Sequence, residues 1–140
     1  MPEAPITYRG TVYPWHCDHM GHMNVMWYVG KFDEGTWQLF HSLGLTPARL
    51  SQEGAGMAAV EQQLEYKREL HAGDVITVRS RVLEVKEKSI RFAHEMTNDE
   101  TGELAARCTI LGVYFDTSLR KARALPSDVS ERAGLLIAKL

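Results

Sequence analysis

The sequence predicts an α+β fold in which one long helix packs against an antiparallel β-sheet, and two patterns predict it. Near the N-terminus, apolar residues recur at steps of three and four, which is typical of a helix with one buried face. Beyond residue 56, alternating apolar and polar residues interrupted by turn sequences indicate antiparallel strands. The 140 residues, 44% hydrophobic and 24% charged, suit a single globular domain spanning residues 1–140.

The first elements are a strand, a loop and the long helix. Residues 6–13 alternate as a strand does and stop at Pro14, and residues 15–24 read as a loop. The helix begins after Asn24, a plausible N-cap, runs for about five turns and stops at Gly44. Gly30 and Gly35 each cost roughly 1 kcal/mol inside it, which predicts that another backbone approaches closely. The apolar positions that define the expected buried face are Val25, Tyr28, Val29, Phe32, Thr36, Leu39, Phe40 and Leu43.

Four strands follow, and we expect them to form an antiparallel meander. They cover residues 57–69, 75–85, 89–98 and 104–116, with turn sequences at 72–74 and 98–102. In the third strand, one face should lie on the helix, and its residues are Ile90, Phe92, His94 and Met96. The tail starts with a polar Pro126-Ser127-Asp128 segment, and its amphipathic run at 129–140 predicts a last turn or two of helix.

Composition and charge exclude several functional classes. With 16 basic and 18 acidic side chains, the net charge of −2 does not suit a nucleic-acid-binding protein. The longest apolar runs are far shorter than the ~20 residues of a membrane-spanning helix. The first residues do not resemble a secretory signal, so we expect a cytoplasmic location without a membrane partner. Cys17 and Cys108 lie in different elements, and neither a disulfide nor a metal pair is expected.

Polar groups with catalytic potential are concentrated just before the long helix, in residues 15–24. A helix start exposes backbone N–H groups and partial positive charge, so the amides of Val25 and Met26 can receive an oxyanion. Hydrolysis of a thioester also needs a carboxylate that attacks directly or deprotonates water, and Asp18 stands in the right place. Taken alone, an Asp before a helix is more often a turn or cap residue.

A family motif favours a catalytic role for Asp18 over a role as a turn or cap residue. Asp18, Gly21, His22, Asn24 and Tyr28 match D-x-x-G-H-x-N-x-x-x-Y, the pattern of the 4-hydroxybenzoyl-CoA thioesterase family, which the chain resembles up to about residue 126. The resemblance implies a hotdog fold, in which a curved antiparallel sheet wraps a long central helix. It also implies an acyl-CoA thioesterase that forms a homodimer, or a homotetramer as a dimer of dimers, with active sites at the dimer interface.

The resemblance assigns roles within the motif. It implies that Asp18 is the nucleophile or general base, that His22 and Asn24 shape the site, and that Gly21 and Tyr28 contact substrate. Basic side chains near strand ends could hold the CoA phosphates, and we name Lys67, Arg68, Lys86 and Lys88, with Ser89 beside the last of them. CoA enters as part of the substrate, and the reaction requires no metal or other cofactor.

Two departures from the family pattern open alternatives. His16 stands where many relatives carry a second acid, and Val25 stands where one branch has a histidine. Another branch takes its carboxylate from the central helix, so Asp33 and Glu34 are reserve candidates. Hydratases of the same fold use a different motif spacing and are disfavoured. A non-catalytic module that binds acyl-CoA or acyl-carrier protein remains an alternative.

Other side chains have weaker functional interpretations. His16, His19 and His22 with Asp18 could be imagined as a metal cluster, but their spacing fits no established ligand motif, and solvated or hydrogen-bonded histidines are commoner. Cys17 is better explained as a buried thiol than as a nucleophile. The tryptophans could line an acyl pocket, the core or the dimer interface, and they are Trp15, Trp27 and Trp37. The remaining histidines read as surface or satisfied strand residues, namely His41, His71 and His94.

Overall fold

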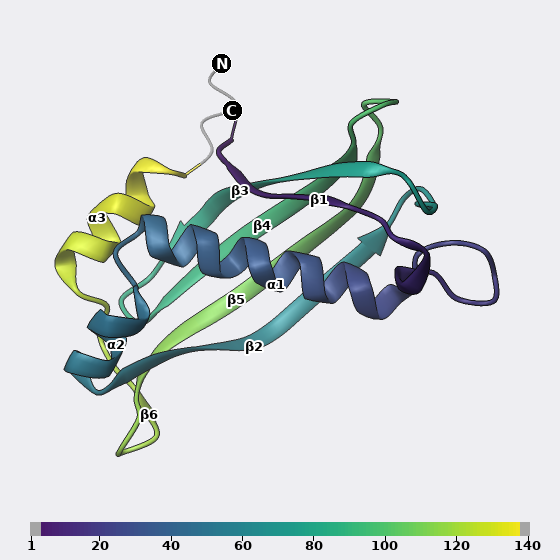
Figure 1. Ribbon diagram of the computed structural model, residues 1–140. Coiled ribbons are helices and arrows are strands. Elements are labelled where there is room, and N and C mark those ends of the chain that lie inside the picture. Colours follow the sequence, from purple (N-terminus) through teal and green to yellow (C-terminus); the bar gives the residue numbers. More distant parts are fainter. Residues whose placement is uncertain (1–3, 138–140) are drawn as a thin grey trace.

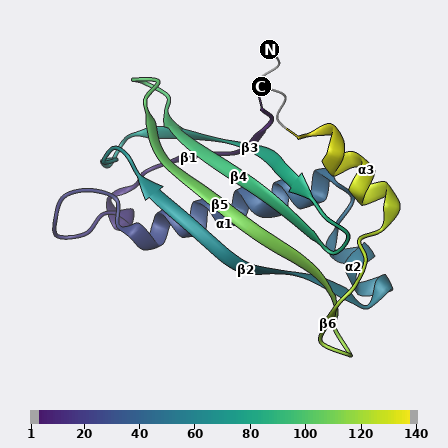
Figure 2. The same cartoon turned by 180° about the vertical axis from the view of Figure 1, so that it is seen from behind.

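The structure, a computed structural model that describes residues 4–137, is an antiparallel sheet curved around one long helix (Figure 1). Seen from behind, the strands form a continuous layer that covers this helix (Figure 2). The elements in chain order are β1 (Ile6–Thr11), the 3-10 helix η1 (Pro14–His16), α1 (Val25–Ser42), α2 (Pro47–Glu53), β2 (Ala55–Tyr66), β3 (Val75–Val85), β4 (Ser89–Asn98), β5 (Leu104–Asp116), β6 (Lys121–Ala122) and α3 (Ser127–Leu135).

The strand order in the sheet is β1-β3-β4-β5-β2, with every neighbouring pair antiparallel and β6 added beside β5. The antiparallel prediction is therefore confirmed, but the four-stranded meander is wrong. Only β3, β4 and β5 form a meander. β2, with 12 residues, pairs instead with β5, which has 13. β1 occupies the edge beside β3. As a result, β1 and β2 are the two edge strands of the main sheet.

Helix α1 has the caps that the sequence predicts. The Asn24 side chain accepts a hydrogen bond from the backbone N–H of Met26 at 3.0 Å, and Gly44 has a φ of +93° after the last turn. The buried face was partly wrong, because the side chains of Val25 and Val29 are 56% and 37% exposed. Lys31 is buried instead, since the buried stripe turns toward β1.

The two glycines of α1 have different surroundings. A Cβ on Gly35 would come within 3.2 Å of Thr7 Oγ1 and within 4 Å of side chains from β3 and β4. A Cβ on Gly30 would meet nothing within 4 Å. The predicted close approach is therefore right at Gly35, where the neighbours are side chains of the sheet rather than backbone, and wrong at Gly30.

The inner face of β4 lies on α1 as predicted, and its four residues Ile90, Phe92, His94 and Met96 have exposed fractions of 0%. His94 is a satisfied core histidine. Its Nε2 lies 2.8 Å from Thr36 Oγ1 on α1, and its Nδ1 is hydrogen-bonded to Ser80 on β3, which in turn pairs with Thr7 on β1. Burial lowers the pKa of His94 to about 4, so the ring is neutral. This polar chain joins four elements, α1, β4, β3 and β1, in the middle of the molecule.

The far end of α1 is covered by two short helices, of which α2 was not predicted. The predicted tail helix is confirmed in part: α3 covers Ser127–Leu135 and so begins two residues earlier than expected, and residues 138–140 of that prediction lie outside the described residues. The bounds of β3, β4 and β5 match the predicted ones, and β2 begins two residues and ends three residues earlier than expected. Within the described range, none of the helices combines the length and apolar character that crossing a bilayer requires.

Candidate active site

The loop between η1 and α1 is closed by backbone hydrogen bonds. The N–H of Asp18 donates to the carbonyl of His22 at 3.1 Å, and the N–H of Gly21 donates back to the carbonyl of Asp18 at 3.0 Å. Gly21 has a φ of +86°, a value that favours glycine at this turn. Below the turn, Met23 donates to the carbonyl of Leu70 at 2.7 Å, which ties the loop to the segment before β3. The loop therefore holds Asp18 at a defined position beside the start of α1.

Both carboxylate oxygens of Asp18 accept hydrogen bonds. Oδ1 accepts from the backbone N–H of Met20 and Oδ2 from the side-chain amide of Asn24, each at 2.8 Å. The Asn24 amide, followed by the Met20 N–H, lowers the pKa of Asp18 below its ordinary value, and His22 and His19 nearby add to this effect. Asp18 is therefore an ionised, oriented and partly accessible carboxylate near neutral pH.

Asn24 connects this carboxylate to the helix start. Its amide nitrogen donates to Asp18 while its carbonyl oxygen caps the N–H of Met26. The Met26 N–H is thus already engaged and is a poor oxyanion donor. The N–H of Val25, the first residue of α1, has no hydrogen-bond partner among residues 4–137. Of the two amides that the sequence predicts, Val25 is the one left to bind an oxyanion.

A cavity of about 190 Å³ lies next to this helix start, between α1 and the end of β2. His22 borders it, with Nε2 3.9 Å from a carboxylate oxygen of Glu69. Tyr28 is only 4% exposed, and burial is the main cause that raises its pKa to about 12. Lys67 and Arg68 also border the cavity, with Lys67 Nζ 2.9 Å from Glu65. Five predicted residues are thus grouped beside the Asp18 loop, namely His22, Val25, Tyr28, Lys67 and Arg68.

The predicted CoA-binding turn is not part of this group within one chain. Lys86, Lys88 and Ser89 lie where β3 meets β4, at the opposite end of the sheet from the Asp18 loop (Figure 1). β3 has 11 residues, so at about 3.3 Å per residue the turn is roughly 30 Å away from the end of the sheet near Asp18. Lys86 pairs with Glu84 at 3.6 Å. Any contribution of this turn to the same site would need a second chain.

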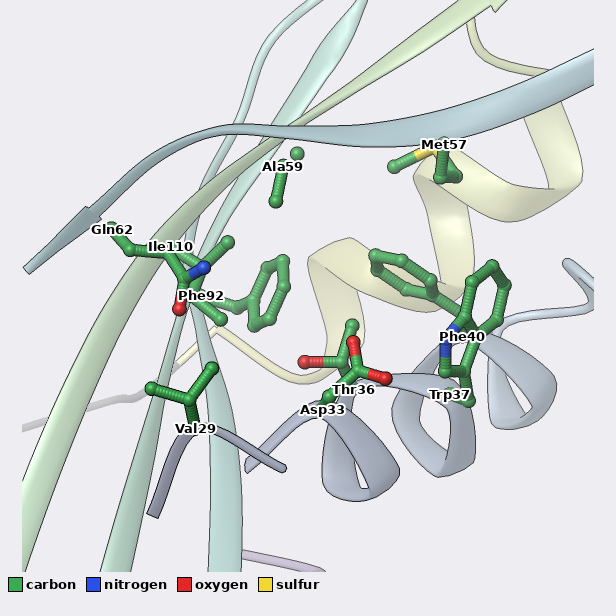
Figure 3. A pocket seen from close by; sticks show the side chains of 11 residues that line it. Val29, Asp33, Thr36, Trp37, Phe40, Met57, Ala59, Gln62, Phe92 and Ile110 are labelled. Carbon is green, nitrogen blue, oxygen red and sulfur yellow. The ribbon is translucent and has the colours of Figure 1, made fainter. Parts of the chain in front are cut away.

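A second cavity, of about 90 Å³, lies between the middle of α1 and the sheet. Figure 3 shows side chains of α1 on one side of it and those of β2 on the other, with Phe92 of β4 between them. Asp33, one of the reserve carboxylates, and Trp37 both border it. Sequence patterns did not reveal this cavity, because its walls come from residues up to 83 positions apart. Its lining is Val29, Asp33, Thr36, Trp37, Phe40, Met57, Ala59, Gln62, Phe92, Ile110 and Gly112.

The remaining candidates have structural environments. His16 is buried, its Nδ1 accepts from the N–H of Tyr13 at 3.0 Å, and burial followed by the charge of Lys31 lowers its pKa. Cys17 is half-buried rather than buried, with Sγ 3.8 Å from the Tyr13 carbonyl. Trp15 and Trp27 border a shallow groove beside β1. Within residues 4–137, no group of three or more His, Cys, Asp or Glu side chains is arranged to hold a metal ion.

The curved sheet around a central helix, with a carboxylate at the helix start, defines the class of hotdog thioesterases, and comparison with known proteins agrees. Residues 12–133 match the thioesterase-like superfamily, and the chain belongs to this family. Both the predicted hotdog fold and the predicted thioesterase class are confirmed.

One curated relative is the L-carnitine dehydrogenase/betainyl-CoA thioesterase of Agrobacterium fabrum (strain C58 / ATCC 33970), which is 28% identical over 109 residues. The match covers 78% of this chain and 22% of that protein, so the chain spans about a fifth of the relative's length.

Solved structures share the fold over almost the whole chain. A Staphylococcus aureus protein solved in complex with CoA superposes with a TM-score of 0.90 at 21% identity, covering 100% of this chain and 90% of that one. A 1,4-dihydroxy-2-naphthoyl-CoA thioesterase from Synechocystis gives a TM-score of 0.82 at 19% identity, covering 92% and 95% of the two chains.

Proposed function

We propose that this chain is an acyl-CoA thioesterase that hydrolyses the thioester to a free acid and CoA, with Asp18 as its catalytic carboxylate. One observation carries the proposal. The Asp18 carboxylate, fixed by Asn24 and kept ionised by its hydrogen bonds, stands beside a helix start whose Val25 N–H is unengaged among the described residues. A nucleophilic or basic oxygen and an oxyanion donor are the two groups that thioester hydrolysis needs.

The reaction follows from these two groups. Asp18 attacks the thioester carbonyl itself or takes a proton from the water that attacks it, and the carbonyl oxygen gains negative charge. The Val25 N–H, at the positive end of the α1 dipole, donates a hydrogen bond to that oxygen. The carbon–sulfur bond then breaks, and the thiolate of CoA leaves and takes up a proton. In the general-base route, the attacking water has already supplied the oxygen of the acid. In the nucleophilic route, the acyl group stays on Asp18 as a mixed anhydride, which water then hydrolyses to the free acid and the carboxylate. Asn24 positions Asp18, and His22 lines the approach to it.

CoA as the carrier is supported by the Staphylococcus aureus structure in complex with CoA and by the relative named as a betainyl-CoA thioesterase. We further propose that two single-domain chains pair through β2, whose exposed edge includes Val60 at 59% exposure. In such a pair, the basic side chains of Lys67 and of the Lys86–Ser89 turn can come from different chains to hold the CoA phosphates.

The test is a panel of acyl-CoAs with short, long, aromatic and cationic acyl groups, betainyl-CoA among them, followed with a thiol-reactive dye. Wild-type protein should cleave at least one class, and Asp18→Asn should lower kcat by about 10²–10⁴-fold, the usual contribution of a positioned acid or base. The melting temperature should change little, because the Asp18 side chain lies at the surface of the loop.

Two further variants test whether Asp18 is the catalytic carboxylate. Asp33→Asn and Glu34→Gln should each retain turnover of at least the neutral esters, because the carboxylates lie about two turns into α1. Full activity of Asp18→Asn together with a dead Asp33→Asn or Glu34→Gln would move the catalytic acid onto the helix. Binding of acyl-CoA without turnover by wild type and variants alike would favour the non-catalytic binding module instead.

A further inference from the structure

The cavity between α1 and the sheet has aromatic walls. Trp37 and Phe40 meet edge to face with their centroids 5.7 Å apart, and Phe40 meets Phe92 in the same manner at 5.4 Å (Figure 3). Phe40 and Phe92 are 4% and 0% exposed, so these rings are held rigidly by the core, while Trp37 is 44% exposed at the rim. Aromatic faces around a desolvated space attract cations through their quadrupoles.

A carboxylate completes this arrangement. Asp33 borders the same cavity, and among residues 4–137 its side chain has neither a hydrogen bond nor an ion pair. The neighbouring Glu34 differs, because it interacts electrostatically with the Tyr8 hydroxyl and with the charge of Lys31. Asp33 therefore leaves one negative charge without a positive partner at the mouth of a pocket whose rings favour a cation.

We propose that this cavity binds an ammonium group at the end of a short acyl chain, so that the substrate class is a cationic acyl-CoA. The inference rests on the proposed thioesterase function and specifies the substrate of that function. A volume of about 90 Å³ limits the pocket to a compact head group and excludes long aliphatic chains. Because a trimethylammonium head is about as bulky as benzene, for which a ~150 Å³ cavity suffices, charge rather than size selects it here. The Asp33 carboxylate selects for positive charge, and the rings hold the methyl groups.

The position of the cavity requires the paired chains. Asp33 follows Val25 by eight residues, which is about 12 Å along the helix and too far for a two-carbon acyl group to span. Pairing of two copies through β2 about a two-fold axis would place their α1 helices side by side and antiparallel. The proposal requires that, in this pair, the start of one α1 lie beside the middle of the other. In this arrangement, the thioester lies at one chain's Asp18 loop while its ammonium group enters the other chain's cavity.

The test compares two thioesters of the same shape and different charge: trimethylammonioacetyl-CoA and tert-butylacetyl-CoA. We expect wild type to prefer the cationic ester by at least about tenfold in kcat/KM. Contacts of a desolvated cation with aromatic rings and with a carboxylate supply enough binding free energy for a preference of this size. Asp33→Asn should lose about tenfold on the cationic ester, mainly through KM, and should keep its activity on the neutral one. Glu131→Gln, which removes an exposed carboxylate from α3, is the matched control and should change neither.

The possible failures are distinguishable. Equal kcat/KM for the two esters in wild type would overturn the cation pocket and leave the thioesterase function intact. Equal losses on both esters in Asp33→Asn would also overturn it, because Asp33 would then serve the chemistry. If wild type cleaves neither ester, calorimetric binding of the two corresponding non-hydrolysable thioether analogues decides: tighter binding of the ammonium analogue supports the pocket, and equal binding refutes it.

Discussion

The two ends of α1 have opposite constructions. At its N-terminal end, the Val25 N–H and the Asp18 carboxylate remain accessible, and large apolar side chains are exposed around them, with Trp15 and Met20 both at 67% and Met26 at 63%. At its C-terminal end, Leu43 and Leu45 are 0% and 1% exposed beneath α2 and α3. One end thus leaves polar and apolar groups open for a ligand or a second chain, and the other end buries them.

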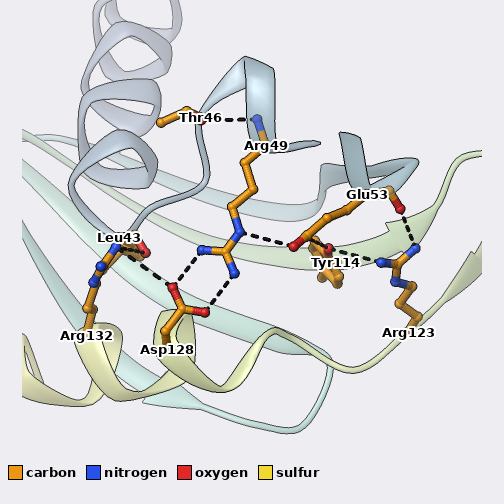
Figure 4. Close-up of polar contacts among 8 residues, drawn as sticks. All are labelled: Leu43, Thr46, Arg49, Glu53, Tyr114, Arg123, Asp128 and Arg132. Atoms are coloured by element: carbon orange, nitrogen blue, oxygen red, sulfur yellow. Dashed lines mark hydrogen bonds and ion pairs between the residues drawn. The ribbon is translucent and has the colours of Figure 1, made fainter. Parts of the chain in front are cut away.

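Polar contacts close the C-terminal end (Figure 4). Arg49 on α2 makes a bidentate pair with Asp128 on α3 at 2.6 and 2.7 Å, and its Nε donates to Glu53 at 3.2 Å. Glu53 also accepts from the hydroxyl of Tyr114 on β5 at 2.7 Å. Arg123 donates to the backbone carbonyl of Glu53 at 2.8 Å. The charges at this end are paired with one another, whereas the groups at the other end, which our proposal assigns to catalysis, are only partly partnered.

The largest expected effect on stability comes from His94, which lies beneath the middle of α1, between the two ends. Its folded pKa of about 4 lies below the ordinary 6.5, so protons bind the unfolded chain first. The stabilisation is complete above pH 6.5 and is lost as the pH falls toward 4, by roughly 3 kcal/mol in the free energy of unfolding. Urea unfolding at several pH values measures the loss. A His94→Gln variant should show a flatter pH dependence, and an unchanged one would contradict this role.

A smaller effect is expected at the closed end. Asp128→Asn removes the charge that Arg49 binds, and it should lower the free energy of unfolding by about 1–2 kcal/mol, or several degrees in melting temperature, because both groups remain partly exposed. The kcat should stay at the wild-type value. Glu131→Gln on the same helix serves as the control for charge alone. Loss of kcat without loss of stability in Asp128→Asn would break the division between the two ends.

The smallest stability effect is expected at the open end. Asn24→Ala removes the helix cap and should cost about 1 kcal/mol. It also removes the strongest cause that lowers the pKa of Asp18, so this pKa should rise and the acid limb of kcat/KM should move to higher pH. Asn24→Asp separates the two effects, since it keeps a capping oxygen but replaces the amide donor by a second negative charge. Asn24→Asp should lose less stability than Asn24→Ala, and it should move the acid limb of kcat/KM to still higher pH. An unshifted limb in both variants would contradict the role of Asn24.

Local patterns in the sequence were enough for most of the elements, though not for α2, and for the core of the motif. The caps at Asn24 and Gly44 located α1, and alternation located β3, β4 and β5, because each of these signals depends on residues only a few positions apart. The Asp18 motif placed the carboxylate beside the helix start for the same reason: the loop closes through contacts between residues 18 and 24. The thioesterase class followed from this segment and was confirmed by the family match.

Only the tertiary structure decided the contacts between distant segments. The pairing of β2 with β5 depends on strand length and on the path over α1, neither of which is written in a local pattern. That pairing places Ala59 and Gln62 over Asp33 and Phe92, and so creates a cavity between residues up to 83 positions apart. It also leaves β2 exposed as an edge of the sheet. The sequence by itself determined most of the elements and the place of the candidate carboxylate, while the order of strands, which is fixed by packing over the whole chain, decided what lies around them.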